Sequence, residues 1–323
     1  MYDYDYRNYS AKRKRSTHKR VSLFLIVLIV GAVVLWFLFA GKRNHVQASQ
    51  SQSVVSRLVG FVEKITEKKE TLQDIVTKEL QGAQGTYAVV IENDTRNERY
   101  AVNENAVYDS ASLYKLWIMA ATYQSIEAGK LKESDPLPAD VSQLNKTFHI
   151  ASDAAELHDG SLDFTVGSAL QQMITISHNY AALALTEKIK LSTVKAFLAK
   201  EGLTQSSVGG DQEGPTTTAS DIALFFKKLS NGELANKEDT QKMLTFLKKQ
   251  QLNNKLPRYL PEDVVIAHKT GELGMMTHDA GIVYTSKGEY RIVILSKSTY
   301  PPGAQERISS LSQAVYEYFM KQQ

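Results

Sequence analysis

The sequence contains no cysteine. This absence excludes disulfide bonds, cysteine-ligated zinc and catalysis by a thiol. Phosphate-binding loops, dinucleotide-binding fingerprints and G-x-S-x-G nucleophile elbows are missing as well. The histidines show no zinc-ligand spacing on one helix face; they are His18, His45, His149, His158, His178, His268 and His278. The sequence therefore predicts neither a metal nor a cofactor.

Excess charge is also lacking over most of the chain. The net charge is +3, but residues 1–20 carry seven Lys or Arg against two Asp, so the remaining 303 residues sum to −2. A nearly neutral body has no basic surface of the kind that binds nucleic acid. Apolar residues at 43% and charged residues at 23% are ordinary for a folded globular protein. We therefore predict a globular body without a nucleic-acid partner.

One long stretch has no charge at all. Residues 21–40 read VSLFLIVLIVGAVVLWFLFA, and as a helix they would span roughly 30 Å, the thickness of a bilayer core. The basic residues 1–20 before this stretch predict a cytoplasmic N-terminus, because positive charge stays on the inner side of a membrane. We expect a single-pass signal-anchor in the cell membrane at residues 21–40, with the body of the chain outside the cytoplasm.

A cleaved signal peptide is the alternative to an anchor. The apolar core of a signal peptide usually has 7–15 residues, fewer than this stretch, and a small-residue cleavage site follows closely. The triplet Val46-Gln47-Ala48 fits such a site but lies eight residues beyond Ala40. A mature N-terminus near Ser49 would show that the segment is removed.

The remaining chain divides into a linker or stalk at residues 41–67 and a folded domain at residues 68–323. Apolar residues recur at helical spacing across this boundary, namely Leu58, Val62, Ile65, Leu72, Val76 and Leu80. They predict either a short coiled-coil stalk or, in their second half, the first helix of the domain. Ile308, Leu311, Val315 and Phe319 mark a C-terminal helix in the same way.

Strand-like runs frame a long helical stretch in this domain. The predicted strands are Thr86–Glu92, Glu98–Val102, Val264–His268, Ala280–Tyr284 and Tyr290–Lys297. Between the second and third lies the helical stretch, at about residues 116–262. We predict an α/β fold of the α+β type, in which a five-stranded antiparallel sheet is flanked by helices and interrupted by an all-helical lobe.

The pattern Ser-x-x-Lys occurs three times, and its position singles out one copy. Ser16–Lys19 lies in the basic head and Ser192–Lys195 within the lobe, whereas Ser112-Leu113-Tyr114-Lys115 stands where a hairpin passes into an apolar helix. A spacing of i, i+3 places the hydroxyl and the amine on one helix face, and the helix N-terminus supplies unpaired N–H groups beside the hydroxyl. Taken alone, Ser112 is better explained as a helix cap.

Two further short motifs follow in order. Ser177-His178-Asn179 lies between two helical runs, and Lys269-Thr270-Gly271 ends the strand VVIAH. Each has a purely structural interpretation, an interhelical turn for the first and a glycine turn for the second. Neither motif identifies a function by itself.

Together, the three motifs and the order of the elements resemble class A β-lactamases and the related penicillin-binding proteins. The signature of that superfamily is S-x-x-K, then S-D-N, then K-T-G. The resemblance covers about residues 68–323 and includes the run TVGSALQQMITISHNYAALALTEKI. It implies a serine hydrolase that forms an acyl-enzyme with a β-lactam or with a D-alanyl stem peptide of peptidoglycan.

The resemblance implies catalytic roles for four residues. Ser112 is expected to attack the carbonyl carbon of the lactam or peptide. Lys115 is expected to take the serine proton, provided that burial and the nearby charge of Lys269 lower its pKa. Ser177 is expected to relay a proton to the leaving nitrogen, while Lys269 assists electrostatically.

Four further positions are expected to bind the substrate. Asn179 would hold its amide, and Thr270 together with Lys269 its carboxylate. The backbone N–H of Glu272, with that of the nucleophile, would stabilise the oxyanion. Gly271 would allow the substrate to approach the backbone closely.

The sequence departs from the family pattern in two places. His178 replaces the Asp of S-D-N, and either a structural role or titration near neutral pH is open to it. The E-x-x-L-N motif, whose Glu activates the deacylating water in class A β-lactamases, is missing from the corresponding stretch EGLTQSSVGGDQEGPTTTASD. Asp211 and Glu213 are its only nearby carboxylates, and solvated loop charges account for both. Acylation followed by slow deacylation is therefore expected.

Three alternatives to a β-lactamase remain open from the sequence. Slow deacylation is typical of a D-alanyl-D-alanine carboxypeptidase or penicillin-binding protein. The anchor and the missing Glu also fit a non-catalytic β-lactam sensor or wall-binding module. A related esterase or amidase would use the same site.

Overall fold

The computed structural model describes residues 70–210 and 213–321. The predicted head, anchor and linker at residues 1–67 lie outside this part, and so do Leu58, Val62 and Ile65. Within the two described ranges, no helix combines the length and the apolarity needed to cross a membrane.

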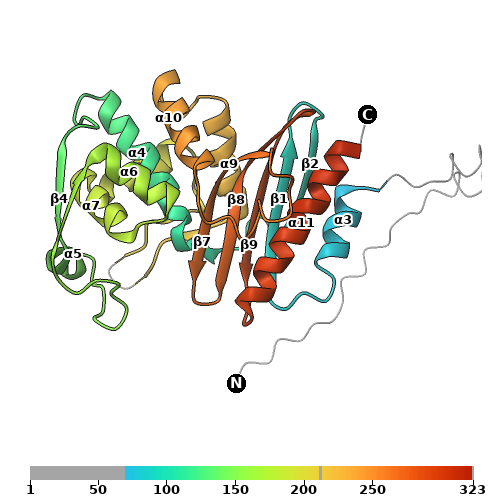
Figure 1. The fold of residues 1–323 in the computed structure, drawn as a ribbon, viewed down its shortest axis with the longest axis horizontal. Coiled ribbons are helices and arrows are strands. Elements are labelled where there is room, and N and C mark those ends of the chain that lie inside the picture. The colour runs from blue at the N-terminus through green and yellow to red at the C-terminus, as the bar shows by residue number, and fades with distance from the viewer. Residues whose placement is uncertain (1–69, 211–212, 322–323) are drawn as a thin grey trace, which may run out of the picture. The chain divides into compact units, whose positions relative to one another are not determined.

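The core element is a five-stranded antiparallel sheet with strand order β2-β1-β9-β8-β7 (Figure 1). Its strands are β1 (Thr86–Asn93), β2 (Glu98–Val102), β7 (Val265–Leu273), β8 (Met276–Thr285) and β9 (Gly288–Lys297). The predicted five-stranded sheet is confirmed. Its strands β1 and β9 are far apart in the sequence and pair with each other.

Two helices cover one face of this sheet. They are α3 (Leu72–Glu79) and α11 (Pro301–Lys321), which lie side by side in Figure 1. Side chains of β1 alternate between the two faces: Val89 and Ile91 pack towards α3 and α11, whereas Ala88 and Val90 face the opposite core. A strand buried on both faces has the continuous apolar run seen in TYAVVIE.

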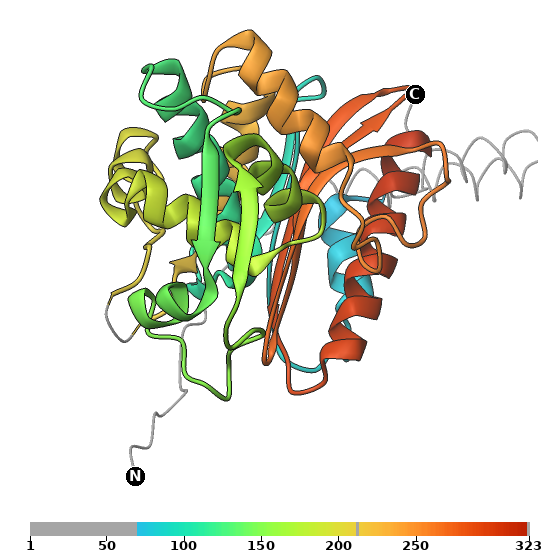
Figure 2. The ribbon, with the colours of Figure 1, turned by 60° about the vertical axis from the view of Figure 1, so that its left-hand side comes forward.

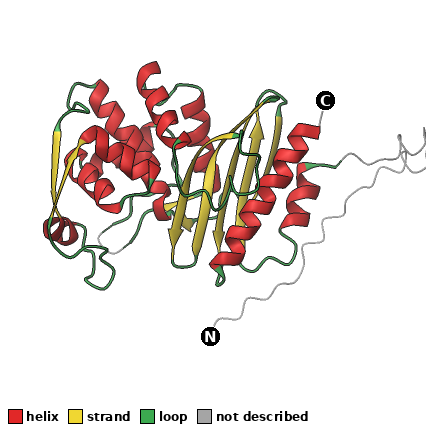
Figure 3. Cartoon of the chain, viewed as in Figure 1, coloured by secondary structure: helices red, strands yellow, loops and turns green. Residues whose placement is uncertain are grey.

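The opposite face packs against the inserted lobe, whose elements follow in chain order. They are β3 (Tyr108–Asp109), a 3₁₀ turn (Ala111–Tyr114), α4 (Lys115–Glu127), β4 (Pro136–Asp140), α5 (Val141–Thr147), β5 (Ser161–Thr165), α6 (Val166–Thr175), α7 (Asn179–Ile189), α8 (Leu191–Lys200), β6 (Thr216–Thr217), α9 (Ala219–Ser230) and α10 (Lys237–Lys248). Figure 3 shows how helices predominate there. Helix α4 is its centre, with every residue from Lys115 to Tyr123 buried.

The lobe is not purely helical, so this part of the prediction was wrong. Strands β4 and β5 form a two-stranded antiparallel sheet on the side of the lobe away from the large sheet (Figures 1 and 2). Leu137 and Ala139 point into the core while their neighbours Pro136, Pro138 and Asp140 are exposed. Two prolines and a short alternation concealed this edge strand in the sequence.

The bounds of β7 also differ from the prediction. The strand was expected to end at His268, but it continues to Leu273 and contains Lys269-Thr270-Gly271. These polar residues remain in the ladder, where Thr270 pairs with Asp279 and Gly271 with His278. Packing against the lobe buries them, which sequence propensity does not register.

Candidate active site

Ser112 lies in the 3₁₀ turn that leads into α4. The apolar helix predicted at the Ser112–Lys115 motif begins at Lys115, after this turn. Ser110 is buried and donates a backbone hydrogen bond of 2.8 Å to Pro215 O, while Ala111 has φ +44°. A non-glycine residue in the left-handed region is strained, and such strain often occurs at functional sites. The turn presents Ser112 half-buried at the boundary between the sheet and the lobe.

Gly271 on β7 lies in tight contact with this turn. A Cβ atom at position 271 would lie 3.2 Å from Ser110 O, 3.3 Å from Ala111 Cβ and 3.3 Å from His278 Cδ2. The absence of a side chain therefore lets β7 pack directly on the turn that carries the nucleophile. The sequence had assigned Gly271 to close approach of the substrate; the contact seen here is with the chain itself.

Lys115 is completely buried and its amine has three acceptors. Its Nζ donates to Ser177 O at 2.6 Å, to Ser177 Oγ at 3.2 Å and to Asn179 Oδ1 at 2.5 Å. The first two motifs, 62 residues apart in sequence, thus meet through one side chain. Within the described residues no hydrogen bond joins this amine to the Ser112 hydroxyl.

Ser177 joins the second motif to the third. Lys269 Nζ donates to Ser177 Oγ at 2.9 Å and to Thr270 O at 2.9 Å. Ser177 itself has φ +59°, a conformation that non-glycine residues adopt rarely. This backbone geometry, in the turn between α6 and α7, places one hydroxyl between two amines.

Burial lowers the pKa values of both amines. The pKa of Lys115 falls to about 7 because burial disfavours its charge, although the Glu156 carboxylate raises it. Lys269 has a pKa well below its usual value, owing first to burial and then to the charge of Lys115. A lysine with a pKa near 7 is partly neutral at physiological pH, so the site contains a base adjacent to Ser177.

Thr270 and Glu272 follow Lys269 on β7. Thr270 is buried, whereas the Glu272 side chain is half-exposed and accepts a 2.5 Å hydrogen bond from Lys255 Nζ. Lys255 is fully buried and also donates to Asn254 Oδ1 at 3.1 Å. Nothing in the sequence singles out Lys255, because it lies in an irregular loop between α10 and β7 with no motif around it.

Glu156 is a second residue that the sequence did not single out. It lies in the exposed loop between α5 and β5, and its carboxylate accepts a hydrogen bond from Asn179 Nδ2. Asn179 therefore connects Glu156 to Lys115, because its Oδ1 is the acceptor for that amine. Glu156 lies in a loop 21 residues before Ser177, and no periodic pattern of apolar residues there indicates its contact with Asn179.

The His178 side chain forms a hydrogen bond with the backbone at the start of α7. Its Nδ1 accepts a hydrogen bond of 3.2 Å from Ala181 N–H and caps α7, and its ring packs edge-on against Phe164 at 5.6 Å. Burial is the first cause of its lowered pKa. The residue thus stays neutral at pH 7 and acts as a helix cap, a role that Asp at this position would also fill.

The loop between α8 and α9 runs beside the nucleophile turn. Asp211 and Glu213 are the carboxylates that the sequence places in this loop, as solvated charges. Glu213 is exposed and its side chain forms no hydrogen bond to the described residues, while Asp211 lies outside them. Glu201 pairs with Lys228 at 2.9 Å, and Asp221 accepts from Gln205 N–H and Ser206 Oγ. Glu201 and Asp221 are therefore occupied in holding the lobe and loop together.

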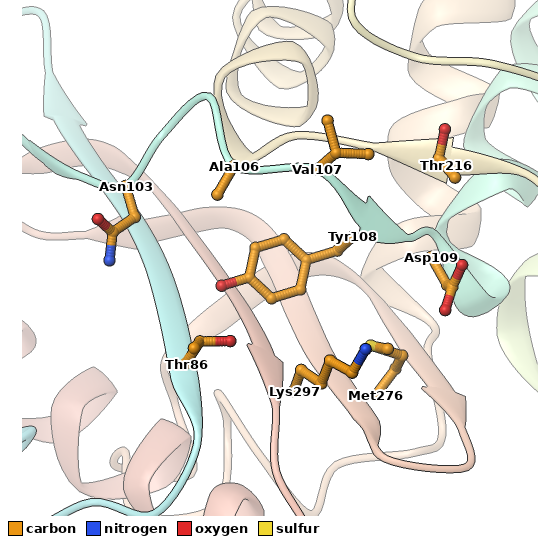
Figure 4. A pocket seen from close by; sticks show the side chains of 9 residues that line it. All are labelled: Thr86, Asn103, Ala106, Val107, Tyr108, Asp109, Thr216, Met276 and Lys297. Carbon is orange, nitrogen blue, oxygen red and sulfur yellow. The ribbon is translucent and has the colours of Figure 1, made fainter. Parts of the chain in front are cut away.

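A separate pocket of about 440 Å³ adjoins this region (Figure 4). It is lined by Thr86, Asn103, Ala106, Val107, Tyr108, Asp109, Thr216, Met276 and Lys297. None of the eight predicted site residues lines it, and it lies beside β3, before the nucleophile turn. No group of acidic residues and histidines in the described ranges is arranged to hold a metal ion.

The fold and the convergence of the three motifs define the serine β-lactamase and transpeptidase superfamily. A five-stranded antiparallel sheet with an inserted lobe brings Ser112, Lys115, Ser177 and Lys269 to one boundary. Residues 67–319 match the family described as the beta-lactamase enzyme family. The chain therefore belongs to that family, whose members include serine hydrolases of this kind.

Several solved structures share this fold. A beta-lactamase from Sphaerobacter thermophilus is 23% identical with a TM-score of 0.69, covering 78% of this chain and 98% of its own. PBP-A is 22% identical with a TM-score of 0.68, covering 78% and 96%. TLA-1 extended-spectrum beta-lactamase is 20% identical with a TM-score of 0.68, covering 79% and 100%. No protein with a curated description matches the sequence.

Proposed function

We propose that this protein is a membrane-anchored, extracytoplasmic serine hydrolase that forms an acyl-enzyme on Ser112 with β-lactams or D-alanyl peptides. The observation that carries the proposal is the Ser177 hydroxyl, which accepts hydrogen bonds from both Lys115 and Lys269. A hydroxyl between two buried amines of lowered pKa is suited to passing protons. A purely structural turn would not require two buried lysines, whose burial is costly.

Acylation would proceed by attack of Ser112 Oγ on the substrate carbonyl carbon, with breakage of the carbon–nitrogen bond. The neutral amine of Lys115 would take the hydroxyl proton of Ser112. Ser177 would donate its own proton to the leaving nitrogen and regain one from Lys115, so that no proton is lost or created. Lys269 would stabilise the negative charge that develops during this exchange.

The remaining residues would bind the substrate around this centre. Asn179 would hold the acyl-side amide, and Thr270 with Lys269 would hold a carboxylate on the leaving side. The backbone N–H groups of Ser112 and Glu272 would stabilise the oxyanion. Gly271 would act indirectly, by allowing β7 to pack on the turn that carries the nucleophile.

Deacylation would be slow, which makes a penicillin-binding protein or D-alanyl-D-alanine carboxypeptidase the second candidate. The sequence has no E-x-x-L-N motif, and Glu201 and Asp221 of the neighbouring loop and helix have structural partners. PBP-A shares the fold, and a variant of that protein has been solved as an acyl-enzyme complex with penicillin G. An acyl-enzyme that accumulates fits this candidate better than rapid lactam hydrolysis.

The proposed location rests on the sequence. An anchor at residues 21–40 and a cytoplasmic head at residues 1–20 would leave the folded domain outside the cytoplasm. Protease added to intact cells should remove the domain and leave the head protected. A domain that resists protease until the cells are lysed would contradict this topology. A mature N-terminus near Ser49 would show that residues 21–40 are removed and would contradict the anchor.

A fluorescent penicillin tests acylation directly. The full-length wild type should become covalently labelled and Ser112→Ala should not. Ser192→Ala provides a matched control, because Ser192 opens the other Ser-x-x-Lys pattern of the folded domain and is exposed; it should label as the wild type does. Labelling of Ser112→Ala would assign the nucleophile elsewhere, and an unlabelled wild type would overturn the proposal.

Turnover separates the candidates within this proposal. Steady-state hydrolysis of a β-lactam should stay below roughly 10 s⁻¹, the median kcat of enzymes. Release of D-alanine from a D-alanyl-D-alanine peptide would favour the carboxypeptidase. A stable lactam adduct with no hydrolysis of lactam, peptide or ester substrates would favour a sensor instead.

A further inference from the structure

The pocket of about 440 Å³ beside β3 has two walls from different parts of the fold. One wall is a cross-strand row at the end of the large sheet, where Lys297 of β9 pairs with both Thr86 and Met276. This row faces the lobe, because Met276 belongs to the core on that side and Lys297 lies two residues from Leu295, which does too. The other wall is formed by residues 106–109 (Figure 4).

Hydrogen bonds hold this second wall in place. Strand β3 pairs with β6, and the Asp109 carbonyl accepts a hydrogen bond of 2.9 Å from His278 Nε2. Ala106 N–H donates to Asn103 O at 2.9 Å, and Asn103 Nδ2 donates to Tyr87 O on β1 at 2.9 Å. The pocket is therefore formed without a ligand, and its volume falls in the range of small-molecule sites, about 300–1,000 Å³.

Two opposite charges line the pocket, the amine of Lys297 and the carboxylate of Asp109. Both side chains are exposed, and in the part of the chain that the structure describes neither forms a side-chain hydrogen bond or a salt bridge. A simple anion would be repelled by Asp109 and a simple cation by Lys297. A ligand that carries both charges would pair with both residues.

The rest of the lining favours a ligand with small apolar groups. Val107 is 65% exposed, so most of its apolar surface is open to an occupant of the pocket. Met276 and Tyr108 also line the pocket and are otherwise buried. Burial of apolar surface on these side chains would add to the binding free energy of such a ligand.

The spacing of the two charged residues fits a dipeptide. Lys297 pairs with Met276, whereas Asp109 is hydrogen-bonded to the ring of His278. These two positions of β8 are about 7 Å apart, because a strand rises about 3.4 Å per residue. Two residues of extended peptide span about the same length.

We propose that this pocket binds a short zwitterionic peptide. Its C-terminal carboxylate would pair with Lys297 and its N-terminal ammonium with Asp109, while small side chains would contact Val107 and Met276. The site is separate from Ser112, and binding does not depend on acylation. A peptide held between β3 and the large sheet would stabilise the folded chain.

Ligand-observed NMR titration of the full-length protein with L-alanyl-L-alanine tests this binding. A ligand of this size should have a Kd of about 1 mM. Two derivatives each lack one charge: the N-acetyl dipeptide has no ammonium, and the dipeptide amide has no carboxylate. Each should bind about fivefold more weakly, the contribution of an exposed ion pair.

Variants of the two charged residues assign the orientation of the peptide. Lys297→Gln should weaken the dipeptide about fivefold but leave the affinity of the amide unchanged. Asp109→Asn should weaken the dipeptide equally but leave the N-acetyl form unchanged. As controls, Lys130→Gln and Asp153→Asn remove exposed charges outside the pocket and should keep every affinity within twofold of the wild type. Melting temperatures would verify that all four variants are folded.

The outcomes separate this site from the proposed active site. No saturation at about 10 mM, tenfold above the expected Kd, would overturn the site, as would equal weakening in all four variants or in none. The dipeptide should bind equally well after benzylpenicillin has acylated the protein, and loss of binding would place it in the active site and overturn the inference. A wild type that binds the dipeptide but is not acylated would overturn the proposed function alone.

Discussion

Lys269 on β7 donates a 2.9 Å hydrogen bond to the hydroxyl of Ser177, which lies in the turn between α6 and α7. The two residues are 92 positions apart, and they join the large sheet to the lobe. Ser177 accepts a second hydrogen bond from Lys115, and its backbone is strained, with φ +59°. Because strain of this kind persists only where surrounding contacts impose it, the turn is shaped for the hydroxyl that it presents.

The pH dependence of acylation should reflect Lys115. Its pKa of about 7 means that the neutral, proton-accepting amine is lost as the pH falls below 7. The acylation rate should therefore reach a plateau above pH 7 and fall tenfold per pH unit well below it. Pre-steady-state labelling with a fluorescent penicillin between pH 5 and 9 measures this profile.

Two variants check the assignment to Lys115. Lys115→Arg keeps a permanent charge and should lower the acylation rate at least 100-fold, the usual contribution of a general base. In Glu156→Gln the profile should move to lower pH, because the Glu156 charge raises the Lys115 pKa. A wild-type rate independent of pH from 5 to 9 would exclude Lys115 as the base.

Stability should rise with pH for the same reason. Lys115 has a pKa of about 7 in the folded state against 10.5 ordinarily, so between these values the unfolded chain binds more protons. Protonation of this lysine therefore favours the unfolded chain, so the free energy of unfolding decreases as the pH falls from 10.5 to 7. Between pH 9 and pH 7 the decrease is about 2 kcal/mol. Urea denaturation should show that Lys115→Met loses this increment, and an unchanged increment would contradict the lowered pKa.

Gly271→Ala should displace the nucleophile. The added Cβ would be 3.2 Å from Ser110 O and 3.3 Å from Ala111 Cβ, so the turn must move by a few tenths of an ångström. We expect acylation to slow at least tenfold and the free energy of unfolding to fall by about 1–3 kcal/mol, as for an overpacked core. Gly214→Ala is the control, since its Cβ would meet nothing within 4 Å. Equal effects of both variants would rule out the proposed packing role.

His278 should make the protein sensitive to acid. Its Nε2–H donates to Asp109 O at 2.9 Å and its Nδ1 accepts from Ser296 N–H at 3.1 Å, an arrangement that requires the neutral ring. Burial lowers its pKa to about 4 from the usual 6.5. The unfolded chain thus takes up the proton first as the pH falls, and stability present above pH 6.5 is lost towards pH 4.

The expected loss from His278 is about 3 kcal/mol over that range. His278→Gln, less stable at pH 7, should lack this share of the acid dependence in urea denaturation at pH 4 and 7. His158→Gln changes an exposed histidine and should retain the wild-type dependence. If all three proteins lose stability equally between pH 7 and 4, the loss arises from other groups.

Local patterns predicted much of the fold. The strand β2 was predicted at its observed bounds and β1 within one residue, because β-rich runs flank a turn of Asn and Asp residues. The bounds of α4 and β7 were less accurate. A 3₁₀ turn precedes α4 because β7 packs against it, and β7 is longer than predicted because the lobe buries its polar half.

The sequence by itself determined which chemical groups the protein has and in what order. Three short motifs on the expected elements sufficed to name Ser112, Lys115, Ser177 and Lys269, because side-chain chemistry and spacing are local properties. Tertiary structure decided what surrounds them: the burial that lowers two lysine pKa values, the contact of Gly271 with the nucleophile turn, and the partners Lys255 and Glu156. These contacts join residues from separate loops and strands, and no local pattern encodes the distances between them.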